Sequence, residues 1–180
     1  GNTGWAVSEI GLGCWEFAGM TGNYGPQDDN VSIRIARHAL QLGVNFFDTA
    51  DVYGSGHSEV VLGRALRHLR EKAIIGTKVG KNFYSVKWQK SFDDAYIKNA
   101  VENSIQRLGV DHIDLYHLHQ PPLEDIEKGD VFQTLEELRE KSRIRFYGIS
   151  ITTPEEGIAA MRMAPGLSSI MCSYNILEQE

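Results

Sequence analysis

The sequence has few cysteines, no long apolar run and no excess of positive charge, and each absence excludes a class of protein. Two cysteines, Cys14 and Cys172, are too few for a disulfide framework, which favours a reducing compartment and predicts a cytoplasmic protein. No apolar stretch approaches the ~20 residues that a membrane-spanning helix needs, so we expect no membrane partner. With 18 basic and 24 acidic side chains, the net charge of −6 argues against nucleic acid as the main partner.

Signals for the two chain ends are also missing. The chain begins with Gly1 instead of an initiator Met, and it stops shortly after an apparent strand at residues 168–173. Its 180 residues, 42% of them hydrophobic, are enough to bury the core of one domain, 1–180. We therefore expect one domain in a partial chain.

Buried-strand patterns alternate with helical patterns along the whole sequence. Apolar runs predict six strands, and helical periodicity predicts five helices between them. The predicted strands lie at 10–15, 45–48, 73–78, 112–119, 144–150 and 168–173. Such an alternation indicates a parallel sheet with right-handed crossovers. The class is therefore α/β, and two architectures fit it: an open doubly wound sheet and a (β/α)8 barrel cut to about six βα units.

Local signals mark several helix ends. Asp28 or Asp29 is a suitable N-cap for the first helix, whose predicted buried stripe is Val31, Ile35, Ala39 and Leu42. Ser58 is the predicted N-cap of the second helix, and 91–94 resembles a capping box before the third. At 153–156, Thr-Pro-Glu-Glu combines a cap, a proline at the first helical position and a reciprocal glutamate, which predicts a helix start there.

The choice between the two architectures depends on a glycine pattern. A doubly wound dinucleotide fold usually carries G-x-G-x-x-G directly after its first strand and at the start of a helix. Here 11–16 read G-L-G-C-W-E, without the third glycine, and a long loop follows. We therefore predict the barrel, with strands seven and eight lacking from this chain.

Polar side chains stand where the predicted strands end. The carboxyl ends of barrel strands meet at one mouth, so residues far apart in sequence converge there. Taken singly, each has an ordinary explanation: Asp48 to Tyr53 reads as a turn, and a lone lysine or histidine is commonly structural. Together they are harder to explain that way. The strand ends present Trp15, Asp48 with Tyr53, Lys78, His119 and Ser150.

Four of these residues make a proton donor. The pKa of a free tyrosine is about 10, and a nearby lysine cation stabilises the phenolate and lowers that pKa. In this interpretation Tyr53 gives the proton, Lys78 assists it, Asp48 holds Lys78 charged, and His119 orients a substrate oxygen. No nucleophile is left to attack carbon, so a hydride from a nicotinamide fits the set.

The motifs along the whole chain closely resemble those of the aldo/keto reductases. They are G-L-G-C-W (11–15), F-F-D-T-A-D-V-Y-G (46–54), S-E-V-V-L-G-R-A-L (58–66), G-T-K-V-G (76–80), the run 104–119 and I-R-F-Y-G-I-S (144–150). The resemblance implies a (β/α)8 barrel that reduces an aldehyde, ketone or sugar carbonyl with NADP or NAD, NADP being favoured. It implies a catalytic tetrad of Asp48, Tyr53, Lys78 and His119. It further implies cofactor contacts at Gly13, Cys14, Trp15, Asp48 and Ser150.

Two positions depart from the family pattern. Where the family usually has an asparagine after Ser150, this chain has Ile151, and Met171 stands where a glutamine usually holds the nicotinamide. Each lost amide removes hydrogen bonds worth about 1 kcal/mol. The alternative is therefore a regulatory homologue that binds the cofactor but catalyses weakly or not at all. The strands and loops expected beyond 180 commonly bind phosphate in barrels. Because an unclosed barrel exposes two strand edges, we also expect this chain to fold poorly alone.

Two further patterns leave alternatives open. His117 and His119 form an H-x-H pair, a spacing that binds zinc in some barrels, although packing one layer below the mouth fits His117 better. We expect no metal. The long loop 79–91 indicates a functional segment, and its aromatic residues predict an aromatic-lined pocket. With the first strand end, that set is Trp15, Phe83, Tyr84 and Trp88.

Overall fold

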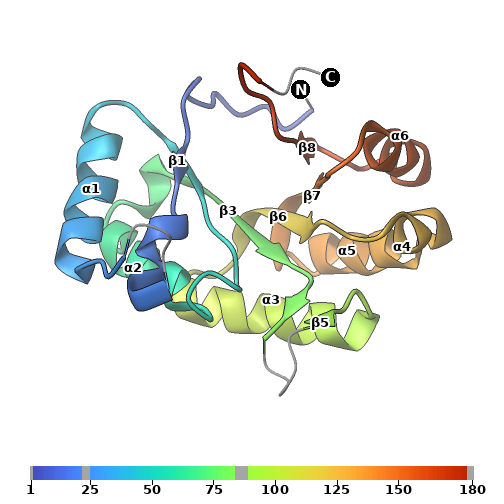
Figure 1. Cartoon of the computed structure of the whole chain (residues 1–180), viewed down its shortest axis with the longest axis horizontal. Coiled ribbons are helices and arrows are strands. Elements are labelled where there is room, and N and C mark those ends of the chain that lie inside the picture. Colours follow the sequence, from blue (N-terminus) through green and yellow to red (C-terminus); the bar gives the residue numbers. More distant parts are fainter. Residues whose placement is uncertain (1, 22–24, 84–88, 178–180) are drawn as a thin grey trace.

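Six parallel strands form one curved sheet with helices on its outer side. The computed structural model describes residues 2–21, 25–83 and 89–177. The strand order is β1-β2-β3-β6-β7-β8, and every neighbouring pair is parallel. The strands are β1 (Leu12–Gly13), β2 (Phe46–Asp48), β3 (Ile74–Val79), β6 (Ile113–His119), β7 (Ile144–Ser150) and β8 (Ser169–Met171). Figure 1 shows them as an arc with the N-terminal coil on its open side. The predicted α/β class, about six units of a (β/α)8 barrel, is confirmed.

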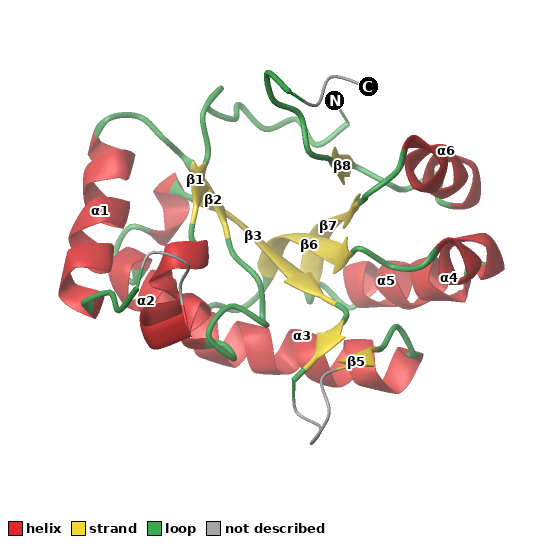
Figure 2. Cartoon of the chain, viewed as in Figure 1, coloured by secondary structure: helices red, strands yellow, loops and turns green. Residues whose placement is uncertain are grey.

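The helices connect consecutive strands of this sheet and lie outside the arc (Figure 2). The α-helices are α1 (Asp29–Gln41), α2 (His57–Leu66), α3 (Asp94–Leu108), α4 (Leu123–Lys128), α5 (Asp130–Glu140) and α6 (Pro154–Met163). Two 3-10 segments, η1 (Trp15–Thr21) and η2 (Arg70–Lys72), lie after β1 and before β3. No helix among the described residues is long and apolar enough to span a bilayer. The core fills the space between sheet and helices, with Phe47 and Ile75 from the sheet against Leu62 and Ile97 from the helices.

One helix and one hairpin were not expected from the sequence. The crossover from β6 to β7 contains α4 in addition to α5, where the sequence predicts one helix. The loop 79–91 contains a short antiparallel hairpin of β4 (Lys81–Asn82) and β5 (Gln89–Lys90). Strands of two residues are too short to produce a recognisable alternating pattern in the sequence.

The capping predictions have mixed outcomes. Asp28 caps α1 by accepting from Asn30 N, and Thr153 with Glu156 forms the complete capping box of α6. The Ser58 prediction is wrong, because α2 begins at His57 after Gly56, whose φ is 92°. The capping box at 91–94 is also wrong, since the side chain of Asp93 accepts from Tyr96 N and caps α3.

The predicted buried stripe of α1 is wrong as well. Ser32 and Ala36 are the buried residues of this helix, whereas Ile35 and Leu42 are 46% and 72% exposed. Small side chains on the inward face let α1 approach α2 closely. The Arg37 guanidinium reaches across and donates from Nε to the carbonyl oxygen of Ala65 at 3.0 Å.

Candidate active site

The strand register brings the sequence-predicted side chains to one end of the sheet. Asp48 is the last residue of β2, His119 of β6 and Ser150 of β7. In the register, Lys78 lies opposite His117 and His119 lies opposite Ser150. Residues from four strands therefore share one cleft because parallel strands carry their carboxyl ends to the same side.

The Lys78 ammonium is the centre of this group. Its Nζ atom donates to Asp48 Oδ2 at 2.7 Å and to the carbonyl oxygen of Thr49 at 2.8 Å, and it lies 3.4 Å from Tyr53 OH. Lys78 is only 1% exposed. An ammonium at that depth stays charged only with a counter-charge and acceptors, which Asp48 and Thr49 supply.

Tyr53 lies between two other rings. The indole of Trp15 stacks on it with centroids 5.5 Å apart and planes 15° apart, and the imidazole of His119 meets it edge-on at 6.1 Å. The Lys78 ammonium lies 5.1 Å from the centroid of the phenol ring. Packing on both sides fixes the direction of the phenol group toward the cleft.

Burial and charge act in opposite directions on the proton of Tyr53. Burial raises the pKa of Tyr53 above its usual value of 10.0, and the Lys78 cation lowers it by a smaller amount. The sequence predicts the effect of Lys78 with the right sign, but burial outweighs it. Burial also raises the pKa of Asp48, with Lys78 partly offsetting it. Tyr53 therefore holds its proton at neutral pH.

Both histidines of the H-x-H pair are buried and neutral. Burial lowers the pKa of His119 to about 3, assisted by the charges of Lys81 and Lys78. Burial, with Lys78, also lowers the pKa of His117 to about 3. His117 Nε2 lies 3.1 Å from Ser169 Oγ. His117 comes two residues before His119 on β6, so it lies one layer of side chains below the mouth. A neutral imidazole offers one donor and one acceptor, which suits the orientation of a substrate oxygen better than the delivery of charge.

A buried ion pair supports the loop of Tyr53 from behind. Glu59, fully buried, accepts from Arg107 Nε at 2.6 Å and from Thr77 Oγ1 at 2.6 Å, and so ties α2 to α3 and β3. Asp51, also fully buried, lies near Glu59 and Arg107, and burial together with the Glu59 charge raises its pKa well above its usual value. These supporting residues could not be predicted from the sequence, because their partners are distant in the chain.

Two glycines are required by close approaches at the site. At Gly54, directly after Tyr53, φ is +60° and a Cβ atom would lie 2.5 Å from the carbonyl oxygen of Ala18. At Gly148 a Cβ atom would lie 2.5 Å from His117 Cδ2. Any larger residue at either position displaces the loop of Tyr53 or the lower histidine.

The cleft above these residues has a volume of about 480 Å³. Its lining comprises Trp15, Val52, Tyr53, Gly54, Lys78, Lys81, His119, Gln120, Ser150 and Met171. This volume is within the range of small-molecule sites, roughly 300–1,000 Å³. Lys81 and Gln120 were not predicted from the sequence, since they belong to the unexpected hairpin and to the turn after β6.

Two observations fit the nicotinamide part of a dinucleotide. Asp48 Oδ1 is buried and has no hydrogen-bond partner among the described residues, so it is free to accept from a sugar hydroxyl. Ser150, 8% exposed, lines the same cleft with a hydroxyl suited to an amide. Of the predicted contacts at 13–15, Trp15 lines the cleft, whereas Cys14 uses its N–H on Asp48 O and its carbonyl on Ser58 Oγ.

The aromatic-pocket prediction is met only in part. Trp15 lines the cleft, but Phe83 lies beside Arg107, whose guanidinium carbon is 5.9 Å from the ring centroid. Tyr84 and Trp88 lie outside the described residues. Within the described ranges, no three His, Cys, Asp or Glu side chains are grouped as a metal site.

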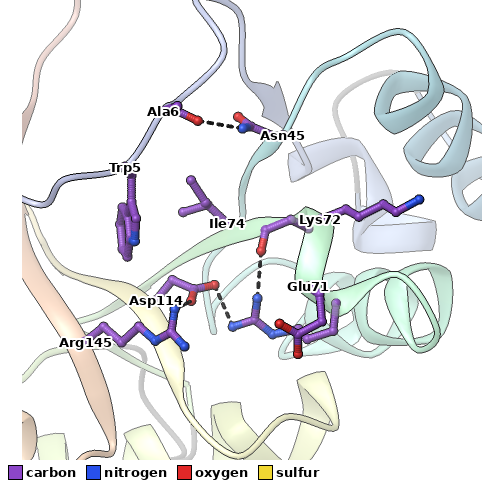
Figure 3. A pocket seen from close by; sticks show the side chains of 10 residues that line it. Trp5, Ala6, Asn45, Glu71, Lys72, Ile74, Asp114 and Arg145 are labelled. Carbon is purple, nitrogen blue, oxygen red and sulfur yellow. Dashed lines mark hydrogen bonds and ion pairs between the residues drawn. The ribbon is translucent and has the colours of Figure 1, made fainter.

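A second pocket of about 260 Å³ lies at the opposite ends of the strands. Figure 3 shows Trp5, Asn45, Asp114 and Arg145 around it. Asp114, 2% exposed, accepts from Arg70 Nη2 at 2.6 Å and from Ile75 N at 2.8 Å. Its Oδ1 atom lies 3.7 Å from both Arg145 Nη1 and His112 Nε2, so the buried carboxylate of this pocket is surrounded by cations and donors of the protein itself.

Comparison with known proteins gives the chain's family. The model of the aldo/keto reductase family matches residues 9–180. The aldo-keto reductase YhdN of Bacillus subtilis is 36% identical over 99% of this chain and 54% of its own length. The holo form of aldo-keto reductase AKR11C1 from Bacillus halodurans is 36% identical, with a TM-score of 0.87 over 97% of this chain and 56% of that one.

A third relative was solved with a nucleotide. An aldo/keto reductase from Klebsiella pneumoniae in complex with NADP and acetate is 30% identical, with a TM-score of 0.73 over 92% of this chain and 54% of that one. The chain thus spans about half the length of the curated relatives it matches. A family match over nearly all of its residues, together with the fold, leads to one conclusion: the chain belongs to the aldo/keto reductase family.

Proposed function

We propose that the protein reduces an aldehyde, ketone or sugar carbonyl, or oxidises the alcohol in reverse, with NADP or NAD and with Tyr53 as the proton donor. The observation that supports this most is the position of Lys78 Nζ, 2.7 Å from Asp48 Oδ2 and 3.4 Å from Tyr53 OH. This geometry gives a protonated phenol a cation that stabilises the developing phenolate. The Klebsiella relative's complex with NADP favours NADP as the cofactor.

Each residue has a defined part in the proposed reaction. When bound, the reduced nicotinamide supplies the hydride that reaches the carbonyl carbon. Tyr53 gives its proton to the carbonyl oxygen, and the resulting phenolate is held by the Lys78 ammonium until solvent returns a proton. Neutral His119 hydrogen-bonds the same oxygen and orients it. Asp48 keeps Lys78 charged.

A second function is favoured by one observation. Met171 lines the cleft at the end of β8, where a thioether replaces a hydrogen-bonding amide, and Ile151 follows Ser150. If the nicotinamide ring is held too weakly for hydride transfer, the protein binds the nucleotide but turns over no substrate. The alternative is therefore a regulatory homologue on the same fold.

The test compares two tyrosine substitutions in the protein at its natural full length. Tyr53→Phe removes the proposed donor, and we expect kcat for small aldehydes with NADPH or NADH to fall by about 10²–10⁴. Tyr174→Phe is the matched control, because Tyr174 is 75% exposed and is not among the residues that line the cleft. Full turnover by Tyr53→Phe overturns the assigned proton donor. Binding of NADPH by a wild-type protein that reduces no carbonyl compound supports the regulatory alternative.

A further inference from the structure

One cation of the cleft has no part in the proposed proton transfer. Lys81 begins β4, just after Lys78 and β3, and its half-buried side chain lines the cleft. Among residues 2–21, 25–83 and 89–177, no carboxylate forms an ion pair with it. A half-buried ammonium without a counter-charge is costly, and it is commonly kept for a ligand.

The wall of the cleft is positive although the chain as a whole is negative. Its lining contains Lys78 and Lys81 but no aspartate or glutamate. Lys78 is neutralised by Asp48 at 2.7 Å, whereas no carboxylate in the part of the chain that the structure describes forms an ion pair with Lys81. In a chain with a net charge of −6, a positive wall at this cleft favours a negatively charged ligand.

The hairpin adds to this positive charge. Lys81 is paired directly with Lys90 across β4 and β5, and like charges facing one another on a sheet are destabilising. The Lys90 ammonium donates to the carbonyl oxygen of Gln120 at 2.8 Å, whereas Lys81 borders the cleft. Burial and the charges of Lys90 and Lys78 lower the pKa of Lys81. An anion beside Lys81 offsets both the cost of burying the ammonium and its repulsion from Lys90 and Lys78.

The strand order separates Lys81 from the proposed nicotinamide position. Lys81 follows β3, whereas Ser150 and Met171 end β7 and β8, and β6 with His119 lies between them. Lys81 and His119 line the same cleft, and the charge of Lys81 contributes to the lowered pKa of His119. Lys81 therefore borders the side of His119 that a substrate occupies when the cofactor lies against Ser150.

We propose that Lys81 binds an anionic group, a carboxylate or a phosphate, on the carbonyl substrate. The residue thereby determines specificity for aldehydes and ketones that carry a negative charge a short distance from the carbonyl carbon. This inference rests on the proposed reductase function, since it names the substrate class of the same cleft.

The test uses pairs of aldehydes, one member of each pair carrying a negative charge and the other neutral. The pairs are 4-carboxybenzaldehyde with 4-carbamoylbenzaldehyde, and glyceraldehyde 3-phosphate with glyceraldehyde. In the full-length protein with NADPH, Lys81→Met should lower kcat/KM for the charged members by about tenfold and leave the neutral members unchanged, because a hydrogen bond between charged groups is lost. If kcat/KM falls for just one of the two charged substrates, that substrate shows whether carboxylate or phosphate is the preferred group. Lys81→Arg should retain most of the preference.

Lys72→Met is the matched control, since Lys72 lies at the pocket on the opposite ends of the strands. It should leave both members of each pair unaffected. Equal effects of Lys81→Met on charged and neutral substrates overturn the proposal. Weaker NADPH binding by Lys81→Met, with the substrate preference intact, also overturns it, because Lys81 then holds a cofactor phosphate.

A binding measurement separates this proposal from the proposed function. Terephthalamate and terephthalamide carry the same ring with and without one carboxylate, and calorimetry gives their Kd values without turnover. If no substrate reacts but terephthalamate binds about tenfold more tightly than terephthalamide only when Lys81 is present, the reductase function fails and the anion site stands. Equal Kd values for the two compounds in the wild-type protein overturn the anion site.

Discussion

The two ends of the sheet each hold a buried carboxylate paired with a cation, yet they differ in what is left unpaired. At the carboxyl ends of the strands, Lys78 Nζ lies 2.7 Å from Asp48 Oδ2, and at the amino ends Arg70 Nη2 lies 2.6 Å from Asp114 Oδ2. Distance alone does not distinguish the two pairs. The two pairs differ in whether the second oxygen of the carboxylate has a partner.

Asp114 uses both of its oxygens within the protein. Oδ2 accepts from Arg70 and from Ile75 N, and Oδ1 lies 3.7 Å from both Arg145 and His112. Asp48 Oδ1, in contrast, has no partner in the part of the chain that the structure describes. We interpret the fully paired end as structural and the incompletely paired end as the one built to receive a ligand, since a buried polar atom without a partner is costly to keep.

Removing the cation at the cleft end should have the largest effect on activity. Lys78→Met deprives Tyr53 of the charge that favours its phenolate, and we expect kcat to fall by about 10²–10⁴. Stability should change less, because methionine fills the space and Asp48, whose pKa is already raised by burial, takes up a proton. Steady-state kinetics and thermal denaturation measure the two effects. Arg70→Met, the same replacement at the other end, should keep kcat; a comparable loss there would erase the distinction.

Removing the carboxylate at the opposite end should affect stability instead. Asp114→Ala leaves Arg70 and the Ile75 N–H buried without their acceptor, and we expect the free energy of unfolding to fall by about 3 kcal/mol. Denaturant unfolding measures this value. Asp111→Ala is the control, because Asp111 is exposed and its loss should cost less than about 0.5 kcal/mol. A stable Asp114→Ala protein with low kcat per folded molecule would contradict the assignment.

Acid should weaken the cleft end through its neutral histidines. The pKa of His117 is about 3 in the folded protein and about 6.5 when unfolded, so the unfolded state binds the extra proton between these values. The stabilisation is complete above pH 6.5 and is lost as the pH falls toward 3, with about 2 kcal/mol lost at pH 5. Asp48 and Asp51, with raised pKa values, act in the opposite direction over their own range.

A comparison of variants isolates the histidine contribution. The free energy of unfolding of His117→Gln, measured from pH 7 to pH 5, should depend less on pH than that of the wild-type protein. His112→Gln at the opposite end should change this dependence less, since His112 is partly exposed beside Asp114. A larger change from His112→Gln would locate the acid sensitivity at the wrong end.

The residues of the cleft were predictable where one rule of parallel sheets was enough. Asp48, His119 and Ser150 end their strands, and parallel strands carry their carboxyl ends to the same side of the sheet. The cap at Thr153 was predictable because all of its partners lie within four residues. In both cases the sequence contains the whole interaction.

Interactions with distant partners could not be predicted in this way. Ser58 has the sequence of a helix cap, but its hydroxyl is buried against Thr49 Oγ1 at 2.8 Å and donates to the Cys14 carbonyl at 2.6 Å. The inward face of α1 was misassigned because several stripes fit its sequence, and only contact with α2 selects Ala36. Burial is likewise invisible in the sequence, so the raised pKa of Tyr53 was not foreseen.

The stacking of Trp15 on Tyr53 has an optical consequence. The Trp15 indole is 49% exposed at the mouth of the cleft. A molecule that enters the cleft therefore changes the polarity around this indole, and with it the indole fluorescence. Trp5 lies at the other pocket, edge-on to Phe146 with centroids 4.6 Å apart. Of these two tryptophans, Trp15 is the one placed to respond to a molecule that enters the cleft.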